Sequence, residues 1–160
     1  MRRKLHDMIA SLTARRRTSA VALLLGACSA VAGSPHALGQ SVAAPSLLTG
    51  AYTEEQALEG RTLYYEQCLL CHGETMAGVD KAPPLAGPQF ESTWKGAPLA
   101  ALVARILTMP PEKPNTLSQE QSVAVLSYIL WYNGFPLGDT PLASTPDVLG
   151  KVVLEIPSRE

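Results

Sequence analysis

The sequence predicts a small all-α domain, and three patterns support this fold class. Apolar residues recur with helical spacing over 99–106, which is typical of one buried helix face. Two capping boxes, Thr53-x-x-Gln56 and Ser118-x-x-Gln121, indicate where helices begin. Only one short segment, 152–156 near the end of the chain, resembles a strand.

Residues 1–39 have the features of a signal peptide. Six Lys or Arg residues and a single Asp give a basic N-terminal region, and residues 20–33 form an uncharged apolar stretch that is too short to span a bilayer comfortably. Cleavage is expected after Ala37-Leu38-Gly39, with Ala30-Val31-Ala32 as the alternative site. We therefore expect a periplasmic protein.

Two features of this leader leave other routes open. Leu25-Gly26-Ala27-Cys28 resembles the lipobox of bacterial lipoproteins, in which the cysteine is acylated. Arg16-Arg17 is compatible with twin-arginine export, although the residues that follow do not strengthen that reading. The protein would be membrane-anchored, facing the periplasm, only if Cys28 is lipidated or the leader is retained.

Charge divides the chain at the end of the leader. Residues 40–160 carry seven basic and thirteen acidic residues, a net charge of −6 with histidine neutral. We do not expect such an acidic protein to bind nucleic acid. A partner attracted by electrostatics should instead present a basic patch.

The first helix is expected from Thr53 to about Leu70. Two glutamates directly after Thr53 favour this start, because carboxylates stabilise the positive end of the helix dipole. Gly60 and Tyr64 share one face of this helix, and the glycine would let another helix approach closely. Residues 73–95 are rich in Gly and Pro and are expected to form a loop with at most a short helix.

Two further helices are expected after this loop. The apolar face over 99–106 defines one of them, which ends at Met109-Pro110-Pro111 because proline pushes the preceding residue out of the α region. The last helix begins at Ser118 and ends at Asn133-Gly134, a favourable left-handed C-cap. The apolar residues of this last helix are distributed around its whole circumference, so other parts of the domain should cover it on more than one side.

The chain after the leader is long enough for one small domain. About 120 residues support only a marginal core unless something else fills its centre. We expect a linker over 40–51, a folded domain over 52–136 and a proline-punctuated C-terminal tail over 137–160.

Cys68-Leu69-Leu70-Cys71-His72 is the most informative motif in the chain. Downstream of an export signal, Cys-x-x-Cys-His is the attachment site of a c-type haem. Each thiol can form a thioether with one haem vinyl group, and His72 can then bind the iron as the proximal ligand. The motif occurs once, so we expect one covalently bound haem c, which would fill the centre of the core.

Other cysteine chemistries fit the sequence less well. A zinc site needs four ligands, and no Cys or His follows His72. A dithiol oxidoreductase would place its Cys-x-x-Cys at the start of a helix in a βαβ unit, whereas this pair ends a helical pattern. The dithiol enzyme is the alternative of another class, and a plain disulfide is a further one.

Met109 is the expected distal ligand of the iron. The other Met and His candidates lie in the leader or near the new N-terminus, except Met76, which is too close to His72 to reach the opposite haem face. The alternative is that Met109 only fills a gap in the core. Ligation by His and Met occupies both axial positions and stabilises Fe(II), which favours electron transfer over catalysis.

Together these motifs resemble the class I cytochromes c over about residues 52–136. The resemblance rests on Cys68-x-x-Cys71-His72-Gly73, Pro83-Pro84-Leu85-Ala86-Gly87, Met109-Pro110 and Val125-Leu126-Ser127-Tyr128-Ile129. It implies a class I cytochrome c fold, in which helices surround a covalent haem and Gly60 and Tyr64 pack against the last helix at Val125 and Tyr128. It also implies that the backbone carbonyl of Pro83, or else of Pro84, accepts a hydrogen bond from the His72 imidazole.

The Met-Pro corner and the 133–138 ending are similar to small cytochromes that accept electrons from quinoprotein or other periplasmic dehydrogenases. This similarity implies an exported electron-transfer protein, not an enzyme, whose iron cycles between Fe(II) and Fe(III). Its partners would be redox donor and acceptor proteins, such as a quinoprotein dehydrogenase and a terminal oxidase. The alternative is a fixed electron-accepting subunit of a periplasmic dehydrogenase complex.

Overall fold

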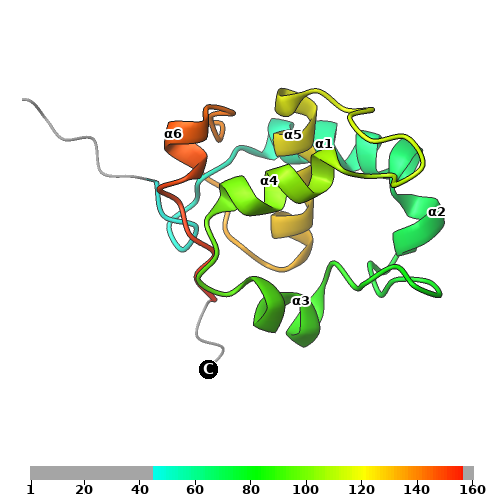
Figure 1. The fold of residues 1–160 in the computed structure, drawn as a ribbon. Helices are drawn as coiled ribbons and strands as arrows, with labels where there is room; N and C mark the ends of the chain where they lie inside the picture. Colours follow the sequence, from blue (N-terminus) through cyan, green and yellow to red (C-terminus); the bar gives the residue numbers. More distant parts are fainter. Residues whose placement is uncertain (1–44, 157–160) are drawn as a thin grey trace, which may run out of the picture. The chain divides into compact units, whose positions relative to one another are not determined.

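The computed structural model describes residues 45–156, and the regular structure in this range is helical (Figure 1). The helices are α1 (Glu54–Gln67), α2 (Leu69–His72), α3 (Gly87–Trp94), α4 (Leu99–Leu107), α5 (Gln119–Tyr132) and α6 (Pro146–Leu149). The predicted all-α class is confirmed. The leader over 1–39, with Cys28 and both export alternatives, lies outside the described residues.

The predicted strand over 152–156 is wrong. Val153 forms only an isolated antiparallel bridge with Pro98, and no strand is present among the described residues. The pairing does not extend beyond this bridge because α4 begins at the next residue, Leu99.

Helices α1 and α5 cross in close contact, as the sequence predicts. A side chain at Gly60 would collide with the backbone carbonyl of Ala124 and lie 2.9 Å from the backbone nitrogen of Val125. Next to this contact the rings of Tyr64 and Tyr128 pack edge to face, with centroids 5.4 Å apart. The glycine therefore brings the two helix backbones together, and the tyrosine pair fills the space beside them.

The caps of these two helices differ from each other. At α5 the capping box is complete, because Ser118 and Gln121 each bond the other's backbone N–H. At α1 only half of the predicted box forms: Thr53 accepts from the backbone N–H of Gln56, but the Gln56 amide turns away. It forms two hydrogen bonds to the backbone of Leu142 instead.

Helix α1 ends at Gln67, earlier than the predicted end near Leu70. Cys68 has φ −117° and ψ −29°, which interrupts the helix, and α2 continues as a single turn up to His72. Gly73 then turns the chain with φ 75°, a conformation that favours glycine. The Cys-x-x-Cys-His motif therefore occupies its own turn after α1.

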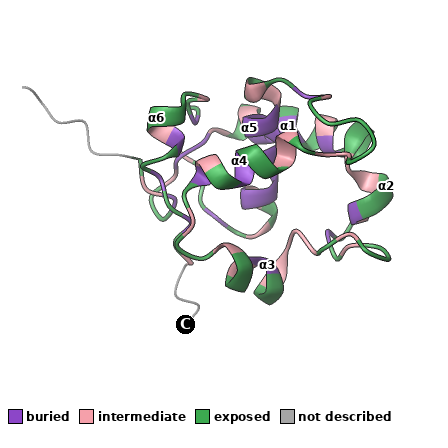
Figure 2. Ribbon diagram, viewed as in Figure 1, coloured by how far each residue is buried: buried purple, intermediate pink, exposed green. Residues whose placement is uncertain are grey.

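Helix α5 lies in the centre of the core (Figure 2). Its residues 122–130 are all buried, which confirms the prediction that this helix is covered on several sides. Helix α4 contributes its predicted face through Leu99, Leu102 and Val103. No helix within 45–156 combines the length and apolar character needed to cross a membrane.

The segments predicted to flank the domain are part of it. In the expected linker over 40–51, Leu47 and Ala51 are buried in the core. In the expected tail over 137–160, four side chains are fully or almost fully buried, namely those of Leu142, Leu149, Val152 and Leu154. The buried positions in these segments lie among polar residues, prolines and glycines, so their sequence pattern is weak. Other apolar residues of the same segments are exposed, namely Leu48, Leu137 and Val153.

The tail also returns to the start of α4. The backbone N–H groups of Gly96 and Leu99 donate to the carbonyls of Leu154 and Val152, and the N–H of Leu154 donates to Ala97. These three hydrogen bonds fix the connection between α3 and α4. Because Trp94 at the end of α3 lines the cavity described next, the tail supports one wall of that cavity.

Candidate haem site

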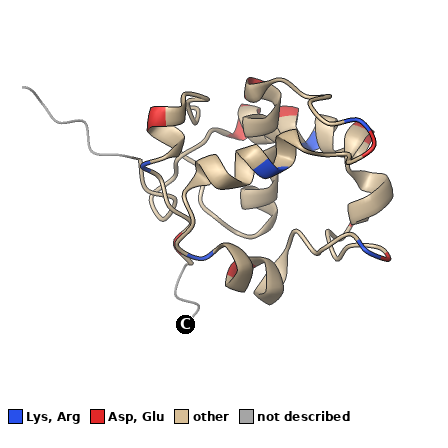
Figure 3. Cartoon of the chain, in the orientation of Figure 1, with Lys and Arg blue, Asp and Glu red and all other residues tan. Residues whose placement is uncertain are grey.

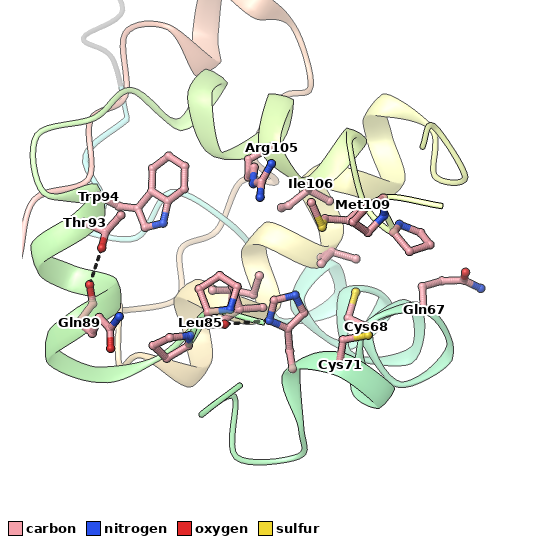
Figure 4. Close-up of a pocket in the computed structure, with 17 residues that line it drawn as sticks. Gln67, Cys68, Cys71, Leu85, Gln89, Thr93, Trp94, Arg105, Ile106 and Met109 are labelled. Carbon is pink, nitrogen blue, oxygen red and sulfur yellow. Dashed lines mark hydrogen bonds between the residues drawn. The ribbon is translucent and has the colours of Figure 1, made fainter. Parts of the chain in front are cut away.

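A largely apolar cavity of about 290 Å³ opens between α1, α3, α4 and α5 (Figure 4). The five residues predicted as haem-binding all line it, namely Cys68, Cys71, His72, Pro83 and Met109. In Figure 4, Met109 and Arg105 enter from the α4 side, while Cys68 and Cys71 enter from the α1–α2 junction. The fold thus gathers residues from four separate parts of the sequence around one space.

The two cysteines lie at the edge of this cavity. Cys68 is half-buried and Cys71 is exposed, and neither forms a disulfide within the described residues. The single turn of α2 places them on the same side of the cavity, as two thioether bonds to one ligand would require. Leu70, between them, points outward and is 92% exposed.

His72 is held in a defined orientation. Its ring is buried, and its Nδ1 lies 3.0 Å from the backbone oxygen of Pro83, so Pro83 rather than Pro84 occupies the partner position. With the Nδ1–H donated to that carbonyl, Nε2 carries the free lone pair that can bind a metal. Burial lowers the pKa of His72; the Pro83 carbonyl opposes this shift, and the Arg105 cation adds to it. The neutral ligand form of the imidazole is therefore favoured.

Met109 is the methionine that reaches this cavity. The other methionine in the described residues, Met76, is fully buried in the core and does not line the cavity. Met109 follows the C-terminal end of α4, which ends at Leu107 before the two prolines. Its thioether is thus available on a different wall from the His72 imidazole.

The cavity lining contains one charged side chain that the sequence analysis did not identify. Arg105 on α4 is the only Lys, Arg, Asp or Glu among the lining residues (Figure 4). A haem carries two carboxylates on an otherwise apolar ring, so one cation in an apolar cavity fits this group. In the sequence, the only sign of its role is that Arg105 lies four residues before Met109.

The alternative cysteine chemistries are not supported by this geometry. No group of three or more Cys, His, Asp and Glu side chains within 45–156 could hold a metal ion. Burial, with a smaller contribution from Cys71, raises the pKa of Cys68 to about 11. Dithiol oxidoreductases need a thiol whose pKa is lowered, so Cys68 is poorly suited to that reaction.

Comparison with known proteins gives one match. Residues 55–129 match the family model described as "Cytochrome C oxidase, cbb3-type, subunit III", a c-type cytochrome domain. Neither a curated protein nor a solved structure matches the chain significantly. The matched range runs from the first turn of α1 to Ile129 in α5 and includes all the predicted haem-binding residues. Residues 55–129 therefore belong to the c-type cytochromes, and the helical fold around them is that of a class I cytochrome c.

Proposed function

We propose that this protein is an exported electron carrier with one covalent haem c, and that His72 and Met109 are the axial ligands of its iron. The c-type cytochrome domain implies electron transfer by a haem protein. The observation that carries the finer proposal is the single cavity that collects the attachment cysteines, an oriented imidazole and a thioether. A bound haem would supply the Fe(II)/Fe(III) couple.

The residues of the chain have distinct tasks in this proposal. Cys68 and Cys71 anchor the macrocycle, and the Pro83 carbonyl fixes the His72 ring and makes its Nε2 a better donor. Met109 would supply the second iron ligand when haem is bound, which would leave no site for an exogenous substrate. Arg105 balances a carboxylate at the edge of the cavity. The protein would accordingly transfer electrons without transforming a substrate itself.

The partners are redox proteins, and the surface around the cavity indicates how they dock. Leu70 is exposed beside Cys71, and the cavity lining contains no carboxylate. The acidic residues of the domain lie outside this lining, and Figure 3 shows their positions along the ribbon. A partner that contacts the cavity edge would therefore meet an apolar surface, and its rate of electron transfer should depend weakly on salt concentration.

A second candidate function is a fixed subunit of a larger redox complex. The matching family is described as a subunit of a cytochrome oxidase, which favours a terminal oxidase as the electron acceptor. A quinoprotein dehydrogenase remains the proposed donor, by the resemblance of the Met-Pro corner. Co-purification of the protein under mild conditions separates a free carrier from a subunit.

Covalent attachment tests the core of the proposal. The double variant Cys68→Ala with Cys71→Ala should keep no haem after acid-acetone extraction, whereas the unmodified protein should retain it and give the pyridine haemochrome spectrum of haem c. Haem that stays with the double variant would contradict the attachment site. Intact mass of the exported protein distinguishes cleavage before Gln40 from acylation at Cys28.

A further inference from the structure

The side chain of Asn133 connects the end of α5 to the loop that orients His72. Its Oδ1 accepts a hydrogen bond from the backbone N–H of Gly87 at 3.0 Å, and its Nδ2 donates to the backbone carbonyl of Leu85 at 2.9 Å. The two bonds hold both ends of the turn over 85–87. This contact joins residues 48 positions apart, so the sequence pattern of either segment does not reveal it.

Asn133 is itself firmly placed. Its Nδ2 also donates to the carbonyl of Ile129 at 2.8 Å, and its backbone N–H bonds to the carbonyls of Ile129 and Leu130. It therefore belongs to the rigid end of α5, a helix that also supplies Ile129 to the cavity wall. A side chain anchored in this way can transmit the position of α5 to the loop.

The loop in turn holds the partner of His72. Pro83, whose carbonyl lies 3.0 Å from Nδ1 of His72, is two residues before Leu85. On its other side Leu85 is bound through its backbone N–H to the carbonyl of Met76 at 2.8 Å. The Pro83 carbonyl therefore lies in a short segment whose downstream end depends on Asn133 and Met76.

We propose that Asn133 is a positioning residue for the haem ligand: by fixing the 85–87 turn, it sets the hydrogen bond between Pro83 and His72. This inference rests on the proposed function, in which His72 binds the iron. A strong hydrogen bond at Nδ1 makes the imidazole a better donor and stabilises Fe(III). When the turn loosens, that hydrogen bond weakens and the reduction potential rises.

The structure provides a matched control for this role. The amide of Gln56 also makes two hydrogen bonds to backbone groups, both on Leu142, and so tethers the tail rather than the haem loop. Asn133→Ala and Gln56→Ala therefore both lose side-chain bonds to a distant loop. Only Asn133→Ala should change the surroundings of His72.

The test uses the haem-loaded protein and two measurements. In Asn133→Ala the Nδ1 proton of His72, followed by NMR in the reduced state, should exchange with solvent about 25- to 100-fold faster. The variant loses two hydrogen bonds to the turn, and each shifts an opening equilibrium by roughly five- to tenfold. Its reduction potential, measured by redox titration, should rise. In Gln56→Ala both quantities should equal those of the unmodified protein.

Two results would overturn the inference. One is an unchanged exchange rate and potential in Asn133→Ala, and the other is an equal change in both variants, which would indicate general loosening. If Asn133→Ala does not fold, Asn133→Asp serves instead, because it keeps the acceptor for Gly87 and loses the donor for Leu85. An Nδ1 proton of His72 that exchanges at the wild-type rate in Asn133→Asp would also overturn the inference. The proposed function has its own test: it is refuted if the unsubstituted protein lacks covalent haem, or if Met109 does not bind the iron. Neither result depends on Asn133.

Discussion

Gly60→Ala tests the helix crossing on which the haem cavity depends. In an exposed helix this change normally stabilises a protein by about 1 kcal/mol, because alanine is the better helix former. Here the added methyl group would overlap the backbone carbonyl of Ala124 and lie 2.9 Å from the nitrogen of Val125. Backbone atoms of a central helix cannot rotate away, so α1 and α5 must separate.

The magnitude follows from these opposing effects. Overpacking in a core costs about 1–3 kcal/mol and more when rigid backbone is the obstacle. We take about 3 kcal/mol for Gly60→Ala, and the gain of about 1 kcal/mol in helix propensity leaves a net loss of about 2 kcal/mol. Separation of the helices would also weaken the contact between Tyr64 and Tyr128.

Guanidinium denaturation of the oxidised haem-loaded protein, followed by far-ultraviolet circular dichroism and the Soret band, measures this loss. Glu59→Ala is the control, since Glu59 is exposed on the same helix and its replacement should change the stability by no more than about 0.5 kcal/mol. If Gly60→Ala is as stable as the unmodified protein, or more stable, the close approach of α1 and α5 is refuted.

Three further predictions concern the ligands and the tail. Met109→Ala should abolish the weak sulfur-to-iron charge-transfer band of the oxidised protein and lower its potential, and an intact band would place the distal ligand elsewhere. Arg105→Gln should lower the potential by on the order of tens of millivolts in a redox titration, because loss of a nearby cation favours Fe(III); no change would mean that Arg105 is remote from the haem. A chain that ends at Gly138 loses the buried Leu142, Leu149, Val152 and Leu154, at about 1.5–3 kcal/mol each, and should not give a cooperative thermal transition; a normal melting temperature would show that the tail is dispensable.

The haem-binding motif and the helix boundaries could be predicted because their information is local. Cys68, Cys71 and His72 lie within five consecutive residues, so the motif can be recognised without knowledge of the fold. The capping box at Ser118 and the stop before Met109-Pro110 likewise depend on neighbours a few residues away. The role of Gly60 could also be predicted, because a glycine inside a helix is destabilising and therefore indicates a close approach by another helix.

The tertiary structure decided what depends on distant partners. The Gln56 side chain suits a capping box locally, yet Leu142, 86 residues away, offers both a donor and an acceptor in one place. The tail and the segment before α1 show no regular apolar pattern by which they could be recognised as core, yet they bury Leu47, Leu142, Leu149 and Leu154.

The same contrast holds at the site. The sequence alone predicted that this chain attaches a c-type haem and that His72 binds the iron. Only the fold brought Arg105 into the cavity and linked Asn133 to the loop that orients His72. An isolated arginine or asparagine has no local pattern, because its role is set by which backbone and side-chain groups the packed helices bring within a few ångströms.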